Sequence, residues 1–344
     1  MRLAIALAGC GRVGRMFLKL LQEKSRLLKE QYHLELKVVT AVDIFGAADD
    51  PKGLDIDKLV TASTSQVGIS GYPGATPGMS GVEAISRTSA QVLVEAGPTN
   101  IQTGEPGLAH FRAALARGMH VVTLSKGPLV VAYPEISSLA KKSGVVLKFS
   151  GATAAALPTT DIALYALAGC KINRIMGILN GTTNYILTRM TRDAVPYEEA
   201  LKEAQAKGIA EPDPSLDVEG WDTASKILIL ANAVMEANLT LKDVDIEGIA
   251  GITLERVKAA RAEGKVIKLM GEACWEGRGV KVNVRPQTIP LEHTLAGVSD
   301  AVKAVHFETD VAGDLTVIGG RSDPKAAAAA ALKDVINLSR EIGS

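Results

Sequence analysis

An acidic segment followed by a lysine is the part of this 344-residue sequence with the most side chains able to do chemistry. Its five carboxylates fall within twelve residues, at Glu211, Asp213, Asp217, Glu219 and Asp222. Lys226 comes four residues after Asp222, so both side chains share one face of a helix that begins here. The helix dipole favours a carboxylate in the first turn. Taken alone, the pattern also fits a solvated acidic loop with a surface ion pair.

A glycine-rich segment, GCGRVG at residues 9–14, has the spacing GxGxxG. It follows the apolar run 2–8, which we expect to be a buried parallel strand, and it precedes an expected helix over 13–23. In this setting the first glycine permits a tight turn, the second lets the backbone approach a pyrophosphate, and the third permits close helix–strand packing. The helix N-terminus presents N–H groups to the phosphates. The alternative is a structural glycine turn without a ligand.

The residues of this predicted dinucleotide site are Gly9, Gly11, Arg12, Val13 and Gly14. Asp43 follows a second expected strand over 34–42, where a carboxylate can accept hydrogen bonds from the adenosine ribose hydroxyls. It lies further from the last glycine than the usual ~20 residues, because the polar stretch 24–33 lengthens the crossover. The alternative is a solvated loop carboxylate.

Asp43 also bears on the choice between NAD and NADP. The three residues that follow it are Ile44, Phe45 and Gly46, so no lysine or arginine directly adjoins the carboxylate. A carboxylate without a neighbouring cation repels a 2′-phosphate, which favours NAD. Lys52 or Lys58 from the following loop would reverse the preference if it folded into the site, so both cofactors stay open.

Strands and helices alternate through the first 150 residues, which predicts a doubly wound parallel sheet of the Rossmann type and an α/β fold. Further expected strands are 91–95, 119–124 and 145–149, and expected helices are 106–117 and 133–142. We therefore expect residues 1–150 to form the dinucleotide-binding domain.

The alternation ends after residue 150, which predicts a following α+β domain over 151–310. Its expected strands are 172–179, 264–273 and 279–289, and its expected helices are 182–190, 197–207 and 222–236. Six alanines at 326–331 predict a closing helix, since alanine has the highest helix propensity. We expect the C-terminal segment 311–344 to pack this helix back onto the first domain.

Composition excludes several functional classes. The 38 basic and 38 acidic residues balance, so the charge gives no reason to bind nucleic acid or an anionic membrane surface. We expect no membrane span, because apolar runs are too short. The three cysteines lack CxxC spacing and the five histidines lack metal-site spacing. These patterns predict no disulfide framework, no metal site and a reducing, cytoplasmic location.

The acidic segment, EPDPSLDVEGWDTASK at 211–226, resembles the substrate motif of homoserine dehydrogenases. Three further blocks in family order are similar: GPTN at 97–100, VVTLSKGP at 121–128 and NGTTNYI at 180–186. With the glycine-rich segment, the resemblance covers about residues 3–235. The length implies the monofunctional form, without a fused kinase or regulatory domain.

The resemblance implies roles for these residues. Glu211, Asp217 and Asp222 would hold the ammonium group of an amino-acid substrate. Lys226 would be the catalytic acid/base, working beside Asp222, and Lys126 would bind substrate or relay a proton. The chemistry is coherent, because reduction of an aldehyde creates an alkoxide that a nearby ammonium can stabilise and protonate.

The implied reaction is hydride transfer between NAD(P) and C4 of homoserine or aspartate 4-semialdehyde, in threonine and methionine biosynthesis. Gly181 and Thr182 would contact the substrate, and Thr99, Ser125 and Lys126 would lie near the cofactor. A cytoplasmic homodimer, formed through the second domain, is implied by the resemblance alone.

Some positions depart from the family pattern. Ser125 replaces an asparagine, Ser150 stands where the family has a glutamate, and residues 319–324 replace a Gly-Ala-Gly turn. Whether the 150–156 turn binds the monovalent cation of the family is left open. Two other functions also remain: an NAD(P) oxidoreductase for another small polar aldehyde, alcohol or amino acid, and a non-catalytic nucleotide-binding sensor.

Overall fold

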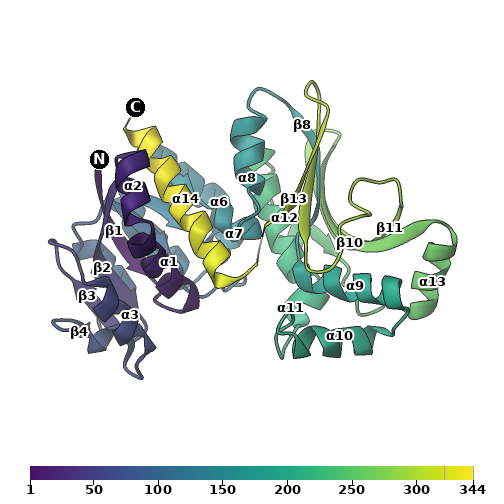
Figure 1. Ribbon diagram of the computed structural model, residues 1–344. Coiled ribbons are helices and arrows are strands. Elements are labelled where there is room, and N and C mark those ends of the chain that lie inside the picture. Colours follow the sequence, from purple (N-terminus) through teal and green to yellow (C-terminus); the bar gives the residue numbers. More distant parts are fainter. Residues whose placement is uncertain (321, 344) are drawn as a thin grey trace. The chain divides into compact units, whose positions relative to one another are not determined.

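The chain forms two compact units in a computed structural model that describes residues 1–320 and 322–343. The first unit comprises Met1–Ala156 together with Asp323–Ser344, and the second comprises Leu157–Ser322. The C-terminal helix α14 (Pro324–Ile342) belongs to the first unit and packs beside α1 (Arg12–Glu23), as Figure 1 shows. The chain thus leaves the first unit, builds the second and returns.

The first unit is built on a seven-stranded sheet with the order β4-β3-β2-β1-β5-β6-β7. Its strands are β1 (Arg2–Ala8), β2 (Glu35–Asp43), β3 (Gly46–Asp49), β4 (Thr76–Pro77), β5 (Val92–Glu95), β6 (His120–Thr123) and β7 (Leu147–Lys148). The strands from β2 to β7 in this order pair in parallel, which confirms the predicted parallel sheet. The antiparallel strands β3 and β4, of which β4 forms the edge of the sheet, were not predicted, because they are short and poor in β-branched residues.

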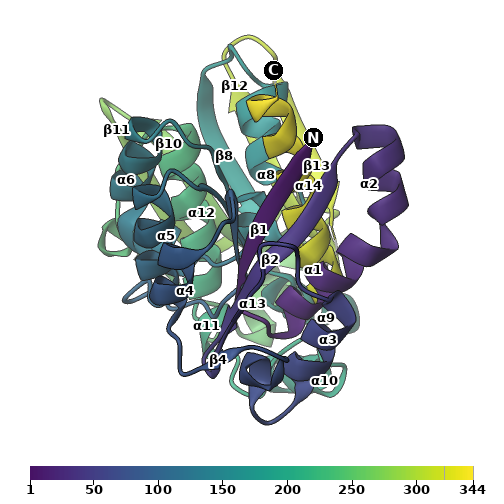
Figure 2. The ribbon, with the colours of Figure 1, turned by 90° about the vertical axis from the view of Figure 1, so that its left-hand side faces the viewer.

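Helices cover both faces of this sheet, as expected for a doubly wound fold (Figure 2). They are α1, α2 (Ser25–Tyr32), α3 (Ile56–Thr64), α4 (Gly81–Arg87), α5 (Gly107–Ala116), α6 (Gly127–Lys142), α7 (Ser150–Ala154) and α14, with a 3₁₀ turn η1 (Gly68–Gly71). Helix α2 occupies the stretch that the sequence analysis described only as polar. Leu28 is its one buried residue, so no apolar face announces the helix.

The second unit is built on a six-stranded sheet with the order β13-β12-β8-β10-β11-β9. The strands are β8 (Ile172–Ile178), β9 (Val244–Ile246), β10 (Lys265–Glu276), β11 (Gly279–Pro290), β12 (Lys303–Thr309) and β13 (Asp314–Gly319). All pairs are antiparallel except β9 with β11. This sheet confirms the predicted change from an alternating to an α+β arrangement.

The helical segments of the second unit are α8 (Thr159–Asp161), η2 (Ile162–Ala166), α9 (Gly181–Asp193), α10 (Tyr197–Ala206), α11 (Ser215–Val218), α12 (Trp221–Val234), η3 (Leu241–Asp243) and α13 (Leu254–Ala262). Helix α12 lies close against the sheet. A Cβ at Gly271 of β10 would approach Thr223 and Ile227 of α12 to 3.0–3.1 Å. The missing side chain therefore sets the spacing between the sheet and the helix that carries Asp222 and Lys226.

The departing segment at residues 150–156 is held by the C-terminal helix. The backbone N–H of Ser150 donates to the buried carboxylate of Asp334 at 3.0 Å, and Lys333 donates to the Ser150 hydroxyl at 2.5 Å. Ala155 follows with φ +53° and ψ −114°, a conformation that glycine adopts readily and alanine rarely. The backbone at Ala155 is therefore strained by about 1–3 kcal/mol.

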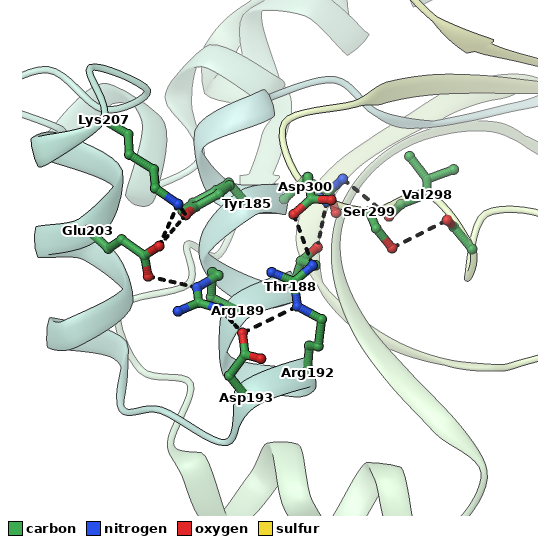
Figure 3. Close-up of polar contacts among 12 residues, drawn as sticks. Tyr185, Thr188, Arg189, Arg192, Asp193, Glu203, Lys207, Val298, Ser299 and Asp300 are labelled. Atoms are coloured by element: carbon green, nitrogen blue, oxygen red, sulfur yellow. Dashed lines mark hydrogen bonds and ion pairs between the residues drawn. The ribbon is translucent and has the colours of Figure 1, made fainter.

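A polar network joins α9, α10 and the loop around Asp300 (Figure 3). The carboxylate of Glu203 accepts hydrogen bonds from Lys207 at 2.6 Å, Tyr185 at 2.8 Å and Arg189 at 2.7 Å. These three bonds, that from Lys207 foremost, lower the pKa of Glu203 to about 2. The network stabilises the pairing of α9 with α10.

Asp300 extends the network to the loop that precedes β12. Its backbone N–H donates to Thr188 at 3.1 Å, and its carboxylate accepts from Arg192 at 3.4 Å. At the start of α9, the Thr182 hydroxyl donates to the carbonyl of Ile209, just after α10, at 3.1 Å. The first turn of α9 is therefore fixed relative to both neighbouring segments.

We predict that Glu203→Gln lowers stability at neutral pH and that the deficit shrinks in acid. A depressed carboxylate pKa stabilises the folded state above the ordinary value of 4.5, and this contribution is lost as the pH falls toward about 2. Thermal midpoints of both proteins measured between pH 7 and pH 2 test this. Glu199→Gln, at an exposed position of the same helix, is the control. A deficit that stays constant across the range would contradict the assignment.

Candidate active site

The glycine-rich turn distinguishes glycines that the fold requires from one that it does not. Gly9 has φ +92°, and a Cβ there would lie 2.4 Å from the nitrogen of Gly97. A Cβ at Gly14 would lie 2.0 Å from the carbonyl oxygen of Gly9. A Cβ at Gly11 would meet no atom of the described chain within 4 Å. Packing therefore demands the outer glycines, whereas Gly11 faces open space, as a site for a pyrophosphate requires.

The N-terminus of α1 begins at this open space. Gly11 is its N-cap, and within residues 1–320 and 322–343 no side chain caps the helix. The first-turn N–H groups, which include those of Arg12 and Val13, have no carbonyl partner within the helix. The Arg15 guanidinium donates to the carbonyls of Cys10 and Ser63 at 3.2 and 3.1 Å, which fixes the turn. These features fit the binding of a dinucleotide phosphate.

Asp43 lies at the end of β2 and is half-buried. Its two carboxylate oxygens accept hydrogen bonds from the backbone N–H groups of Phe45 at 2.9 Å and Ile69 at 2.8 Å. The carboxylate is thus held in one orientation. Lys58 forms an exposed ion pair with Asp55, with 4.0 Å between the charged atoms.

The loops after β5 and β6 bring together the residues predicted to lie near the cofactor. The backbone N–H of Lys126 donates to the Thr99 hydroxyl at 3.3 Å, and the Ser125 hydroxyl donates to the carbonyl of Pro98 at 3.3 Å. A Cβ at Gly127 would lie 2.5 Å from the carbonyl oxygen of Asn100. The two segments, separate in sequence, therefore form one surface at the carboxyl end of the sheet.

A buried carboxylate that the sequence analysis missed supports this surface. Glu95, the last residue of β5, is fully buried. One oxygen accepts from the N–H of Gly97 at 2.7 Å, and the other lies 2.7 Å from Nδ1 of His110. In the sequence, Glu95 stands out only as a carboxylate at the end of the apolar run 91–95. No local pattern indicates that it pairs with a histidine of α5. The pair positions the start of the Gly97–Asn100 loop.

The acidic segment and its lysine form a cluster in the second unit. Nζ of Lys226 lies 2.5 Å from Oδ2 of Asp222 and donates to the carbonyl of Leu179 at 2.7 Å. The two side chains share a face of α12, as the spacing predicted. They are only 13% and 11% exposed, which excludes the alternative of a surface ion pair.

Asn180 joins this cluster to α9, and the sequence analysis did not name it as a site residue. Its side-chain amide donates to Asp217 at 2.6 Å and to Asp222 at 2.9 Å. Its carbonyl oxygen caps α9 by accepting from the N–H of Thr183 at 2.9 Å. Burial, and then the charge of Asp222, raise the pKa of Asp217. The cluster thus places two carboxyl groups beside a single ammonium, that of Lys226.

The other carboxylates of the segment lie apart from this cluster. Asp213 accepts from Ser215, and Glu219 accepts from Nε1 of Trp221 at 3.1 Å. Glu211 is exposed, and the structure gives its carboxylate no hydrogen bond to the cluster in the described part of the chain. Its carbonyl accepts from Gln205 at 3.3 Å.

The predicted substrate contacts Gly181 and Thr182 begin α9 next to Asn180. A Cβ at Gly181 would lie 2.9 Å from the carbonyl oxygen of Ala301. Glycine at this position therefore lets the loop that precedes β12 approach the start of α9. Two further features are absent from residues 1–320 and 322–343. No three or more histidine, cysteine or acidic side chains are grouped for a metal ion, and no helix has the length and apolar character of a membrane span.

We predict that Gly11→Val weakens dinucleotide binding without unfolding the protein. The new side chain would enter the open space where the pyrophosphate must lie, so the affinity for NAD⁺ should fall at least about tenfold, or about 1.4 kcal/mol. Calorimetric titration and the thermal midpoint measure the two effects. Gly14→Ala is the contrasting variant: its Cβ would meet the backbone of Gly9, so it should lower the thermal midpoint, which Gly11→Val should not. A folded Gly11→Val protein with unchanged affinity would show that the turn is structural.

Comparisons with known proteins agree with this geometry. The profile of the homoserine dehydrogenase family matches residues 158–336, and that of the homoserine dehydrogenase NAD-binding domain matches residues 9–150. A homoserine dehydrogenase from Methanocaldococcus jannaschii is 40% identical over 334 residues, which cover 97% of this chain and 98% of the relative.

Two further similarities span the chain. An NAD(+)-dependent homoserine dehydrogenase from Pseudomonas canavaninivorans is 36% identical, with 97% of this chain and 95% of the relative covered. The crystal structure of a homoserine dehydrogenase from Thiobacillus denitrificans superposes with a TM-score of 0.85 and 27% identity, covering all of this chain and 74% of that one. This chain therefore belongs to the homoserine dehydrogenase family and contains its NAD-binding domain.

Proposed function

We propose that this protein interconverts L-homoserine and L-aspartate 4-semialdehyde by hydride exchange with a nicotinamide dinucleotide. The observation that carries the proposal is the shielded cluster of Asp217, Asp222 and Lys226, tied together by Asn180. It combines acidic groups for a substrate ammonium with a lysine for proton transfer. The named activity of the family relatives supports the same reaction.

The cofactor site is assigned to the first unit. Gly9, Gly11, Arg12, Val13 and Gly14 would hold the pyrophosphate, and Thr99, Ser125 and Lys126 would border the cofactor further along. Asp43 would bind the adenosine ribose. When bound, the nicotinamide ring supplies or accepts the hydride.

NAD is the preferred cofactor in this proposal. The fixed carboxylate of Asp43 opposes the negative charge of a 2′-phosphate. The relative that is named NAD(+)-dependent supports the same preference. NADP would be the weaker alternative.

Asp217 and Asp222 would bind the substrate ammonium, and Glu211 would add a third carboxylate from the exposed side of the segment. The raised pKa of Asp217 reflects burial and the nearby charge of Asp222, and an incoming cation would offset the repulsion from Asp222 by restoring charge balance. Gly181 and Thr182 would contact the rest of the amino acid from the start of α9.

Lys226 would move the proton at the substrate oxygen. In the reductive direction its ammonium donates to the alkoxide that forms at C4, and in the oxidative direction its neutral amine accepts the hydroxyl proton. Asp222 and the carbonyl of Leu179 orient Nζ by hydrogen bonds of 2.5 and 2.7 Å. Lys126 would bind substrate or relay a proton.

Three further proposals follow from membership of the family. The reaction would serve threonine and methionine biosynthesis, the protein would act in the cytoplasm, and two copies would associate through the second unit. The altered turn at residues 150–156 and the replaced glycine turn at residues 319–324 are the sequence features behind a second candidate function, an NAD(P) oxidoreductase for another small polar aldehyde, alcohol or amino acid.

The direct experiment is oxidation of L-homoserine by the purified protein, followed by the absorbance of the reduced nicotinamide with NAD⁺ or NADP⁺. Turnover supports the proposed reaction. Turnover only with other alcohols or amino acids supports the second candidate, and cofactor binding without turnover of any of them supports a sensor.

We predict that Lys226→Met lowers kcat by roughly 10²–10⁴-fold, the usual contribution of a general acid, and leaves NAD⁺ affinity unchanged. Methionine keeps the apolar stem and removes the charge, so packing is separated from chemistry. Lys126→Met, made in parallel, should mainly raise KM if Lys126 binds substrate. Steady-state kinetics and calorimetry measure these effects. Near-normal kcat in a folded Lys226→Met protein would transfer the acid/base role to Lys126.

A further inference from the structure

The carboxylate of Asp43 is held by two segments of the first unit. Phe45, two residues further along, donates its N–H to Oδ1 at 2.9 Å, which is a local turn contact. Ile69 donates its N–H to Oδ2 at 2.8 Å from a separate element, the 3₁₀ turn η1 that follows α3. The contact from Ile69 therefore comes from outside the segment formed by β1, the glycine-rich turn and α1.

The donor on η1 is itself fixed. The side chain of Ile69 is fully buried in the hydrophobic core beneath the sheet, among residues that include Leu59. Its carbonyl accepts from the N–H of Tyr72 at 2.9 Å, and the Tyr72 hydroxyl accepts from the N–H of Asp55 at the start of α3. An amide anchored in this way cannot follow Asp43 if the carboxylate rotates.

Gly68 is what lets η1 come this close. Its φ is +53°, and a Cβ at this position would lie 2.3 Å from Oδ2 of Asp43 and 2.4 Å from Cδ2 of Phe45. Any other residue would push the carboxylate, the ring or the turn away. The glycine therefore serves the approach to Asp43 and not only the conformation of its own backbone.

We propose that Gly68 and Ile69 are positioning residues that determine the selectivity for NAD over NADP by locking Asp43. Each carboxylate oxygen can accept two hydrogen bonds, so the locked group can still accept from the vicinal ribose hydroxyls. A 2′-phosphate needs Asp43 to turn away, which breaks its charged hydrogen bond to the immobile N–H of Ile69. This inference rests on the proposed use of Asp43 as the ribose ligand.

The test is a double-mutant cycle on Gly68 and Asp43, with the dissociation constants of NAD⁺ and NADP⁺ measured by calorimetry. Gly68→Ala should weaken NAD⁺ binding at least about fivefold and NADP⁺ binding less than about twofold, so the selectivity falls. In an Asp43→Ala background, Gly68→Ala should leave the selectivity unchanged within about twofold, because its target is gone.

Gly74→Ala is the matched control. Gly74 also has a positive φ of +82°, but a Cβ there would meet no atom of the described chain within 4 Å. It should lower the thermal midpoint, as an alanine with positive φ does, and leave both dissociation constants unchanged. If Gly68→Ala is too unstable to purify, the cycle is run with Phe45→Ala in every protein. This change removes the Phe45 ring that the new methyl group would otherwise contact, and it leaves the contact with Asp43.

Three results would overturn the proposal: wild-type protein without selectivity for NAD⁺, a Gly68→Ala protein with wild-type selectivity, or an equal effect of Gly68→Ala with and without Asp43. The proposed reaction is tested separately by homoserine oxidation. A protein that does not oxidise homoserine yet shows Gly68-dependent selectivity would contradict the reaction and uphold this inference.

Discussion

The side-chain amide of Asn180 is the contact on which the chemistry of the second unit depends. Two aspartates close together and shielded from water repel each other, and burial adds to the cost of their charges. Asn180 donates to both of them while its carbonyl oxygen caps α9, so one residue couples helix formation to the placement of Asp217 and Asp222. Lys226 supplies the compensating charge on one side only. In the proposed function, the remaining negative charge would be the physical basis for recognising an ammonium group.

In the first unit, the structural requirement is an open space beside a closely packed turn. Gly9 and Gly14 are required because backbone atoms lie where their side chains would be, whereas the space beside Gly11 stays open. Around this turn the ends of β2, β5 and β6 are each fixed by side-chain contacts, from Asp43, Glu95 and Ser125. These contacts hold loops rather than strands, and loops are where a parallel sheet binds its ligands.

Local patterns in the sequence predicted many of the helices and strands and named several residues of the candidate site. Apolar runs located β1, β2, β8, β10 and β11, and the spacing of Asp222 and Lys226 placed both on one face of α12. The unpredicted parts depend on residues far apart in sequence or on elements without an apolar pattern. Asn180 reaches Asp217, Glu95 reaches His110 and Ile69 reaches Asp43, and none of these pairs has a local signature. Helix α2 was missed because it buries one residue.

The central claim is that two part-buried carboxylates select an amino-acid alcohol through its ammonium group. Its most direct test is the ratio of kcat/KM for L-homoserine to that for 4-hydroxybutyrate, which lacks the amino group, in the wild-type protein and in Asp217→Asn. Asparagine keeps the size of the side chain and removes its charge. The account predicts a strong preference for homoserine that falls at least about tenfold in the variant, since the substrate ammonium would lose a part-buried charged partner. An unchanged ratio in a folded Asp217→Asn protein would contradict the claim.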